Sequence, residues 1–224
     1  MSGTANLAWV SGTPPTPPNP YVQMASYASL VPETGGTVTW PTAPTDGNIL
    51  YVFIFGDNDF NDPSGYTKIL EDPLGPFLGV YYKIASGEST SLPLTWLSGM
   101  DVVIAYEFPV AGHSGTVDDD GSQTWPATSA AETIGTAFAT HTNDYVFAVA
   151  GFADGGITSV GTFSFDSGFA SIGYKQSLAS GTSTLNLEMI IGFIKGPTAT
   201  SYSSTLTIQH AANVDNPALI FAMS

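Results

Sequence analysis

The chain has no cysteine and no arginine among its 224 residues, and only four lysines oppose its 19 acidic residues. Without cysteine, neither a disulfide scaffold nor a thiolate metal site can form. At a formal charge of −15, the chain lacks the basic stripe with which proteins neutralise phosphates. An anionic membrane surface would repel it for the same reason. We therefore expect no nucleic-acid partner and no membrane insertion.

Two kinds of segment are also missing. No run of about eighteen apolar residues occurs, so we expect no membrane-spanning helix. The first twenty residues, MSGTANLAWVSGTPPTPPNP, contain neither a basic n-region nor an apolar h-region, so we expect no signal peptide and synthesis in the cytoplasm. Charged residues make up 10% of the chain, whereas glycine and proline contribute 24 and 16 residues. This composition favours an all-β, turn-rich protein without enzymatic activity.

Residues 1–21 form an N-terminal segment of distinct composition. Five prolines between positions 14 and 20 favour extended, polyproline-like backbone. They follow a short apolar group that includes Leu7, Trp9 and Val10. Both a disordered tail and an arm that docks Trp9 on a neighbouring subunit fit this pattern. Because disordered segments seldom contain tryptophan, we favour the arm, with Leu7, Trp9 and Val10 as its partner-binding residues.

Residues 22–224 show the alternating pattern of β-strands. Ile49–Phe55 is a continuous apolar run between turn residues, which predicts a strand buried on both faces. Further strands are expected near residues 78–84, 92–96, 102–108, 145–150, 185–194, 206–210 and 218–223.

The order of these strands is repeated. Residues 145–150 correspond to residues 49–55, and the three strands that follow each run also match in order. We therefore predict two copies, at about 27–109 and 129–224, joined by an acidic linker at 110–128. The copies could be two small domains or the halves of one sandwich, and we favour the sandwich because continuous apolar strands need cover on both faces. The expected fold is an all-β, jelly-roll-like β-sandwich built from two copies of a short-strand unit, with an extended N-terminal arm.

Acidic residues at two places could hold a cation. Oxygen ligands alternate along one loop, at Asp57, Asp59, Asn61 and Asp62. The calcium-loop consensus would place Gly at 62 and Glu at 68, where this chain has Asp62 and Lys68, so a helix–loop–helix site is excluded. In the linker, Asp118–Asp120 are three adjacent carboxylates, either solvated or bound to a cation. We expect a polar turn and a solvated linker, and thus no metal and no cofactor; a calcium ion bound in the first loop is the alternative.

The residue types that carry catalysis show no recognisable spacing. His113, His141 and His210 stand in unrelated contexts that match no zinc motif. None of the acidic residues forms an evident glycosidase pair. We therefore expect no catalytic residues.

Four aromatic residues stand in loop-like contexts, namely Trp40, Trp125, Tyr27 and Tyr202. Such side chains can stack on sugar rings, close the ends of a sandwich or contact a neighbouring subunit, and the sequence favours none of the three. Trp40 and Trp125 are the candidate glycan-binding residues.

Five motifs follow one another in the first copy: Gly47-Asn48, Pro63–Thr67, Tyr81-Tyr82-Lys83, Thr95-Trp96 and Val102–Tyr106. In this order they resemble a module of tailed-bacteriophage virion surface proteins, which commonly carries a second, weaker copy downstream. The resemblance covers residues 27–224. It implies a virion structural protein without catalytic residues, made in the host cytoplasm and located in the virion.

Within that resemblance, the expected function is a capsid decoration or cement protein that binds the head surface. Its partners would be the major capsid protein or other virion proteins, and it would form a homo-oligomer. The alternative is a receptor- or glycan-binding module of a head or tail fibre or spike, with a host glycan as its partner.

Overall fold

The computed structural model describes the fold from Pro20 to Ser224, with gaps. The described residues are 20–29, 33–56, 59–72, 77–99, 101–110, 115–124, 131–142, 144–155, 162–165, 168–177, 185–195, 198–209 and 217–224. Every element in these ranges is a β-strand. They contain no helix long and apolar enough to cross a membrane. Leu7, Trp9 and Val10 lie outside them.

The first half of the chain forms two antiparallel sheets. Its strands are β1 (Gln23–Ala28), β2 (Glu33–Thr39), β3 (Ile49–Gly56), β4 (Thr67–Asp72), β5 (Phe77–Ile84), β6 (Ser91–Gly99) and β7 (Asp101–Phe108). Five of them form a sheet in the order β1-β7-β3-β5-β4, and β2 pairs with β6 in a small second sheet. The first and last strands of this half therefore lie side by side, as in a jelly roll.

The second half has the same plan with one additional strand. Its strands are β8 (Val117–Thr124), β9 (Ala131–Phe138), β10 (Tyr145–Gly155), β11 (Thr162–Phe165), β12 (Ala170–Ser177), β13 (Leu185–Lys195), β14 (Ser201–Gln209) and β15 (Ala218–Met223). The larger sheet has the order β8-β15-β10-β13-β12, which matches the first half strand for strand. In the smaller sheet, β9 and β14 take the places of β2 and β6, and β11 is added beside β14. The predicted all-β, jelly-roll-like sandwich of two copies is confirmed.

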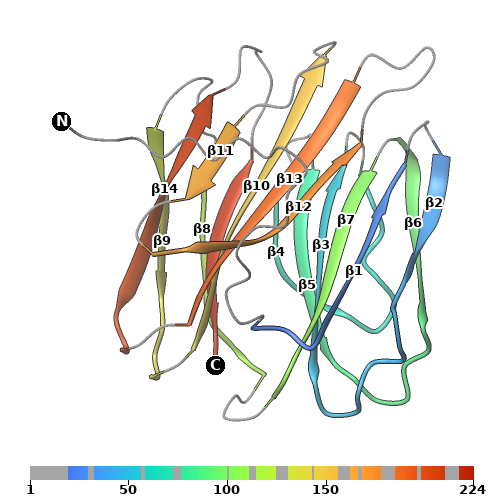
Figure 1. Cartoon of the computed structure of the whole chain (residues 1–224), viewed down its shortest axis with the longest axis horizontal. Coiled ribbons are helices and arrows are strands. Elements are labelled where there is room, and N and C mark those ends of the chain that lie inside the picture. The colour runs from blue at the N-terminus through green and yellow to red at the C-terminus, as the bar shows by residue number, and fades with distance from the viewer. Residues whose placement is uncertain are drawn as a thin grey trace.

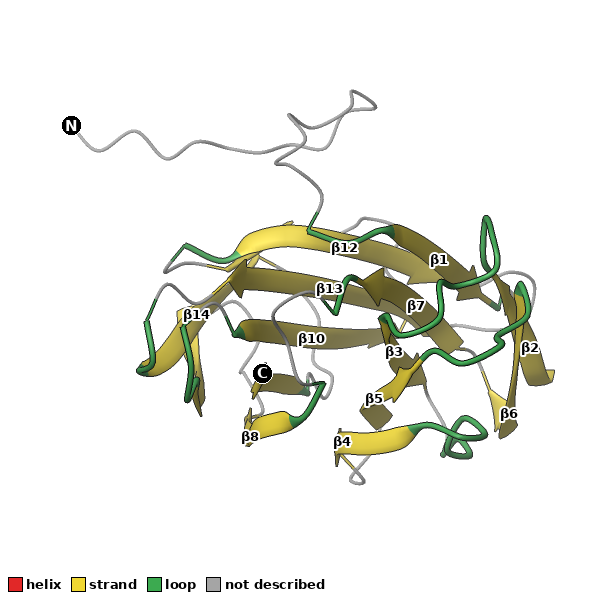
Figure 2. Cartoon of the chain, turned by 90° about the horizontal axis from the view of Figure 1, so that it is seen from below, coloured by secondary structure: helices red, strands yellow, loops and turns green. Residues whose placement is uncertain are grey.

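The four sheets are stacked in four layers (Figures 1 and 2). The two larger sheets face each other across a shared core, and each smaller sheet covers the outer face of its own larger sheet. The sequence left open whether the copies are two small domains or the halves of one sandwich. Both descriptions apply in part, because each copy has its own pair of sheets and the copies also share a core. β3, β7 and β15 are buried along their whole length, since their sheets are covered on both faces.

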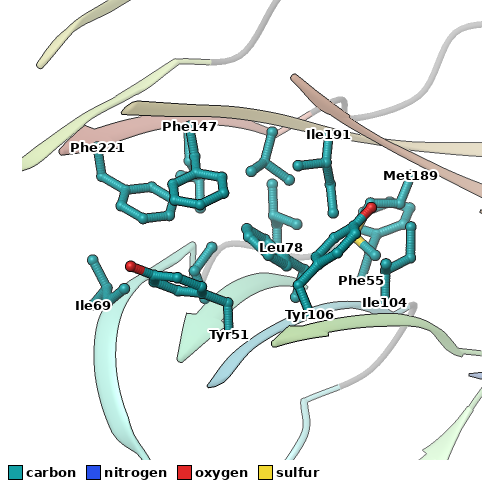
Figure 3. Close-up of a cluster of buried hydrophobic side chains, with 14 of the residues drawn as sticks. Tyr51, Phe55, Ile69, Leu78, Ile104, Tyr106, Phe147, Met189, Ile191 and Phe221 are labelled. Atoms are coloured by element: carbon teal, nitrogen blue, oxygen red, sulfur yellow. The ribbon is translucent and has the colours of Figure 1, made fainter. Parts of the chain in front are cut away.

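Aromatic rings from both copies fill the shared core (Figure 3). The ring of Tyr51 on β3 lies 4.9 Å from that of Phe147 on β10, which in turn stacks on Phe221 at 5.1 Å. Such pairs contribute about 0.5–1.5 kcal/mol beyond the burial of their surface. The two copies are therefore joined by close aromatic packing.

The segment that connects the copies differs from the prediction. Residues 110–128 were expected to be a solvated linker, but β8 lies within them and pairs with β15 at the edge of the larger sheet. Its sequence, VDDDGSQT, has no apolar alternation because an edge strand needs few core side chains. This part of the predicted linker is a strand of the second copy.

Candidate functional site

A buried carboxylate marks one end of the first copy. Glu107 on β7 is fully buried, and it accepts hydrogen bonds from the Asn48 side-chain amide at 2.5 Å and from the Thr45 N–H at 2.9 Å. The side-chain amide of Gln23 on β1 donates to its other oxygen, also at 2.5 Å. One negative charge is thus surrounded by three N–H donors.

The corresponding place in the second copy has a different set of side chains. Asp144 immediately precedes β10, as Asn48 immediately precedes β3. Ala222 pairs with the second residue of β10, as Glu107 pairs with the second residue of β3. A second carboxylate, Asp118, comes from β8, the strand that corresponds to β1. The second copy therefore holds two carboxylates where the first holds one carboxylate and two amides.

His141 completes a cluster with these two carboxylates. Its Nδ1 lies 3.8 Å from Asp118 Oδ2 and 3.8 Å from Asp144 Oδ2, and the three ligand atoms all lie within 4.8 Å of one another. The aspartate side chains are only 6% and 3% exposed, whereas that of His141 is 69% exposed. The cluster is therefore buried on its carboxylate side and open to solvent on its imidazole side.

Backbone amides of the turn before β10 hold the two carboxylates in place. Thr140 N–H donates to Asp118 Oδ2 at 3.0 Å, and His141 N–H donates to Asp144 Oδ2 at 2.6 Å. The Thr140 hydroxyl lies 2.8 Å from His141 Nδ1. These contacts leave the two carboxyl groups facing each other.

The proximity of the two carboxyl groups separates their pKa values. Burial and the neighbouring Asp118 carboxyl raise the pKa of Asp144 from its usual 3.8 to about 6. Burial also acts to raise the pKa of Asp118, but hydrogen bonds from Asp144 and Thr140 outweigh it and lower that pKa overall. The pair can thus share a proton or hold a cation.

The geometry does not suit glycoside hydrolysis. The ligand oxygens of Asp118 and Asp144 lie within 4.8 Å of each other. A glycosidase pair stands about 5 to 9.5 Å apart, so that the scissile bond fits between the two groups. The arrangement resembles a set of metal ligands more closely than an acid–base pair.

A second feature is an apolar hollow of about 220 Å³ beside Pro20, the first described residue. Its lining is formed by Pro20, Gly168, Ala170, Ile172, Phe193, Ile194 and Lys195. Most of these residues belong to β13 and to β12, which is an edge strand of its sheet. The volume is below the 300–1,000 Å³ or so of pockets that enclose a small-molecule ligand, so it suits a side chain better.

The structure places the predicted glycan-binding residues differently from the expectation. Trp40 is only 3% exposed and packs in the core between β2, β6 and the larger sheet, so its ring cannot stack on a sugar. Trp125 lies outside the described residues. Tyr27 packs against Trp96 at 5.9 Å, and the hydroxyl of Tyr202 donates to the Thr198 carbonyl at 2.7 Å. Tyr27 packs against the core between the two sheets of the first copy, and Tyr202 packs against the corresponding core of the second copy.

The described part of the loop with alternating acidic residues is tied to its surroundings by polar contacts. Asp62 forms an ion pair with Lys68 at 3.2 Å, and the Asn61 side chain donates to the Thr95 hydroxyl at 3.0 Å. Asp59 is exposed, and Asp57 lies outside the described residues. In the described part of this loop, no three ligand groups come together.

Of the three residues in this cluster, the sequence points only to Asp118 as a possible cation ligand. The sequence matches His141 to no metal motif and gives no reason to connect Asp144 with Asp118, because neither residue is near Asp118 in the chain. The match between Thr142-Asn143-Asp144 and Asp46-Gly47-Asn48 was a usable signal, since it places a carboxylate in the second copy where the first has an amide. His113 and His210 lie outside the described residues.

The chain matches no protein-family model, no curated protein and no solved structure. The resemblance to a bacteriophage module therefore stays a prediction.

Proposed function

We propose that this protein is a structural protein of a bacteriophage virion, a capsid decoration protein that binds the head surface. The observation that carries the proposal is the place where the N-terminal arm joins the body. Pro20, the first described residue, forms part of the wall of the apolar hollow. The apolar side chains near the start of the proline-rich arm could fill the apolar hollow of a neighbouring copy, and this contact would connect the two copies.

The composition of the arm favours docking on a neighbouring copy over docking on its own body. Residues 11–19 separate Val10 from Pro20, and a polyproline backbone, which rises about 3.1 Å per residue, would span roughly 30 Å over this distance. If this segment is extended, as its prolines favour, Trp9 would lie far from the hollow beside Pro20 of its own copy. Trp9 would therefore reach the hollow between β12 and β13 of the next copy.

The strength of such a connection comes from repetition. Burying one large apolar side chain stabilises a contact by about 1.5–3 kcal/mol, and ordering the arm offsets part of this. Copies linked in this way on a symmetric head would add avidity, with the major capsid protein or other virion proteins as partners. The duplicated jelly-roll-like fold, an architecture common in viral capsid proteins, supports the same proposal by analogy.

Deleting residues 2–19 tests the arm. We expect the truncated protein to fold, to lose its self-association in analytical ultracentrifugation and to lose binding to particles stripped of this protein. Trp9→Ala in the full chain should weaken both properties, and Thr4→Ala serves as its matched control. If the truncated protein forms assemblies with the same number of chains and binds particles as well as the full chain does, the proposed role of the arm is refuted.

Immunogold electron microscopy on purified particles tests the location. Label over the heads supports decoration, and label on tail tips or fibres favours the receptor-binding alternative. A complete absence of label contradicts the virion assignment. For a glycan-binding role, the variant to examine is Trp125→Ala, since Trp40 belongs to the core.

A further inference from the structure

We propose that Asp118, His141 and Asp144 bind one divalent cation of the Mn²⁺ or Zn²⁺ class, which ties the edge strand β8 to the turn before β10. This inference is independent of the virion assignment, because it rests on the geometry and charge of the cluster alone.

The charge of the cluster is the first argument. Two carboxylate side chains, each more than nine-tenths buried, face each other in the second copy. A buried charge is stable only when it is paired or coordinated. Among the described ion pairs, those of Lys68 and Lys83 lie in the first copy, so neither lysine neutralises this pair. In the described part of the chain its ion-pair partner is His141, which carries a positive charge only when it is protonated.

The first copy shows how the same place is stabilised without an ion. There, Asn48 and Gln23 donate amide hydrogens to the single carboxylate of Glu107. In the second copy, Asp144 stands in the position of Asn48, and Asp118 comes from the strand equivalent to that of Gln23. The neutral amide donors are thus replaced by carboxyl groups, and a bound cation would offset the negative charge that these groups add.

The spacing of the ligand atoms is the second argument. His141 Nδ1 lies 3.8 Å from one oxygen of each aspartate. Ligands at about 2.0–2.2 Å from a tetrahedral metal are roughly 3.3–3.6 Å apart, so His141 Nδ1 needs to approach each aspartate oxygen by only a few tenths of an ångström. The two aspartate oxygens already lie within 4.8 Å of each other. The exposed imidazole can make this movement, and the open side of the cluster leaves room for water as a further ligand.

The mixture of ligands indicates the class of ion. Two carboxylate oxygens and one imidazole nitrogen suit Zn²⁺ or Mn²⁺. Ca²⁺ prefers six to eight oxygen ligands, and Mg²⁺ prefers an octahedral shell of oxygens. We therefore expect Mn²⁺ and Zn²⁺ to bind in preference to Mg²⁺ and Ca²⁺.

The location suggests a structural role for the ion. β8 is an edge strand of its sheet. In its pairing with β15, Ala222 lies opposite Asp119 and Met223 lies opposite Val117, so the register shifts by one residue between the two pairs. Asp118 lies between Val117 and Asp119, at the irregular point of the edge. A cation held there would join this point to the turn that begins β10.

The test uses untagged full-length protein, stripped with EDTA and exchanged into chelator-free buffer at pH 7.5. Mn²⁺ and Zn²⁺ are titrated by isothermal calorimetry and by thermal unfolding, with Mg²⁺ and Ca²⁺ in parallel. We expect one site per chain, a rise in Tm with Mn²⁺ or Zn²⁺, and a nitrogen coupling from imidazole in the Mn²⁺ electron paramagnetic resonance spectrum.

Asp144→Asn is the decisive variant, because it installs the amide that the first copy already uses at Asn48. It should remain folded, gain stability in metal-free buffer and bind Mn²⁺ at least tenfold more weakly. His141→Ala should weaken binding and remove the nitrogen coupling. Asp62→Asn, which alters an exposed carboxylate elsewhere, should bind as the wild type does.

Two results would overturn the proposal. The first is the absence of Mn²⁺ or Zn²⁺ binding at millimolar concentration, which would leave a shared proton as the only link between the carboxyl groups. The second is binding that Asp144→Asn leaves unchanged, which would place the ion elsewhere.

Discussion

The hydroxyl of Tyr106 on β7 donates a hydrogen bond of 2.9 Å to the carbonyl oxygen of Ile172 on β12. This bond crosses from the first copy to the second, beside the aromatic core that the two larger sheets share. A β-carbon on the adjacent Gly173 would lie only 2.0 Å from the same hydroxyl oxygen. The side chain of Tyr106 and the backbone of β12 therefore depend on each other.

Substitutions at this contact should couple. We expect Tyr106→Phe to lower the free energy of unfolding by about 1 kcal/mol, the usual contribution of one hydrogen bond. Gly173→Ala should cost about 1–3 kcal/mol through overpacking, and less when Phe replaces Tyr106 because the hydroxyl is then gone. Urea unfolding of both single variants and the double variant measures the coupling. Equal costs of Gly173→Ala in the two backgrounds would contradict it.

The shared core should respond strongly to the loss of a ring. Phe147 contacts Tyr51 and Phe221, and it is fully buried between the larger sheets. Phe147→Ala should lower the free energy of unfolding by about 3–5 kcal/mol, because the removed ring leaves a cavity. Val22→Ala, at a residue that is 55% exposed, is the control and should have little effect. A similar, small effect of both substitutions in denaturant titration would mean that the two copies do not share this core.

Glu107 should make stability depend on acid pH. Burial raises the pKa of this carboxyl, but donors from Asn48, Thr45 and Gln23 outweigh burial and hold the pKa below its usual 4.5. A carboxyl with a lowered pKa in the folded state stabilises the fold above pH 4.5 and loses this contribution as pH falls through the folded pKa.

The matching variant is Glu107→Gln. It should be less stable than the wild type at pH 7, by about 1.5–3 kcal/mol, because the charge-assisted hydrogen bonds are lost. The difference should shrink as the pH falls from 5 to 3. Thermal unfolding of both proteins across this range provides the measurement, and a difference independent of pH would show that Glu107 is not the group that titrates.

Trp40 should act on stability and not on ligand binding. Its ring lies in the core between β2, β6 and the first larger sheet, so Trp40→Ala should cost about 3–5 kcal/mol. Circular dichroism melts combined with a glycan array separate the two roles. A variant with unchanged Tm and lost sugar binding would instead restore Trp40 as a glycan-binding residue.

The sequence predicted the central strands well and the edge strands poorly. β3 and β15 are continuous apolar runs because their sheets are covered on both faces, and such runs are visible without a structure. β2, with the sequence ETGGTVT, and β8 have no such pattern. Edge strands hold their place mainly through backbone hydrogen bonds, which leave little trace in the choice of side chains.

The repeated order of strands, the apolar core positions and the high negative charge were determined by the sequence itself, because each follows from local pattern or composition. Which strands pair with one another was decided only by the tertiary structure. The pairing of β8 with β15 and of β15 with β10 brings Asp118 to Asp144, although the two are separated along the chain by a whole strand. Such a meeting depends on the register of strands distant in sequence, and no local pattern encodes that register.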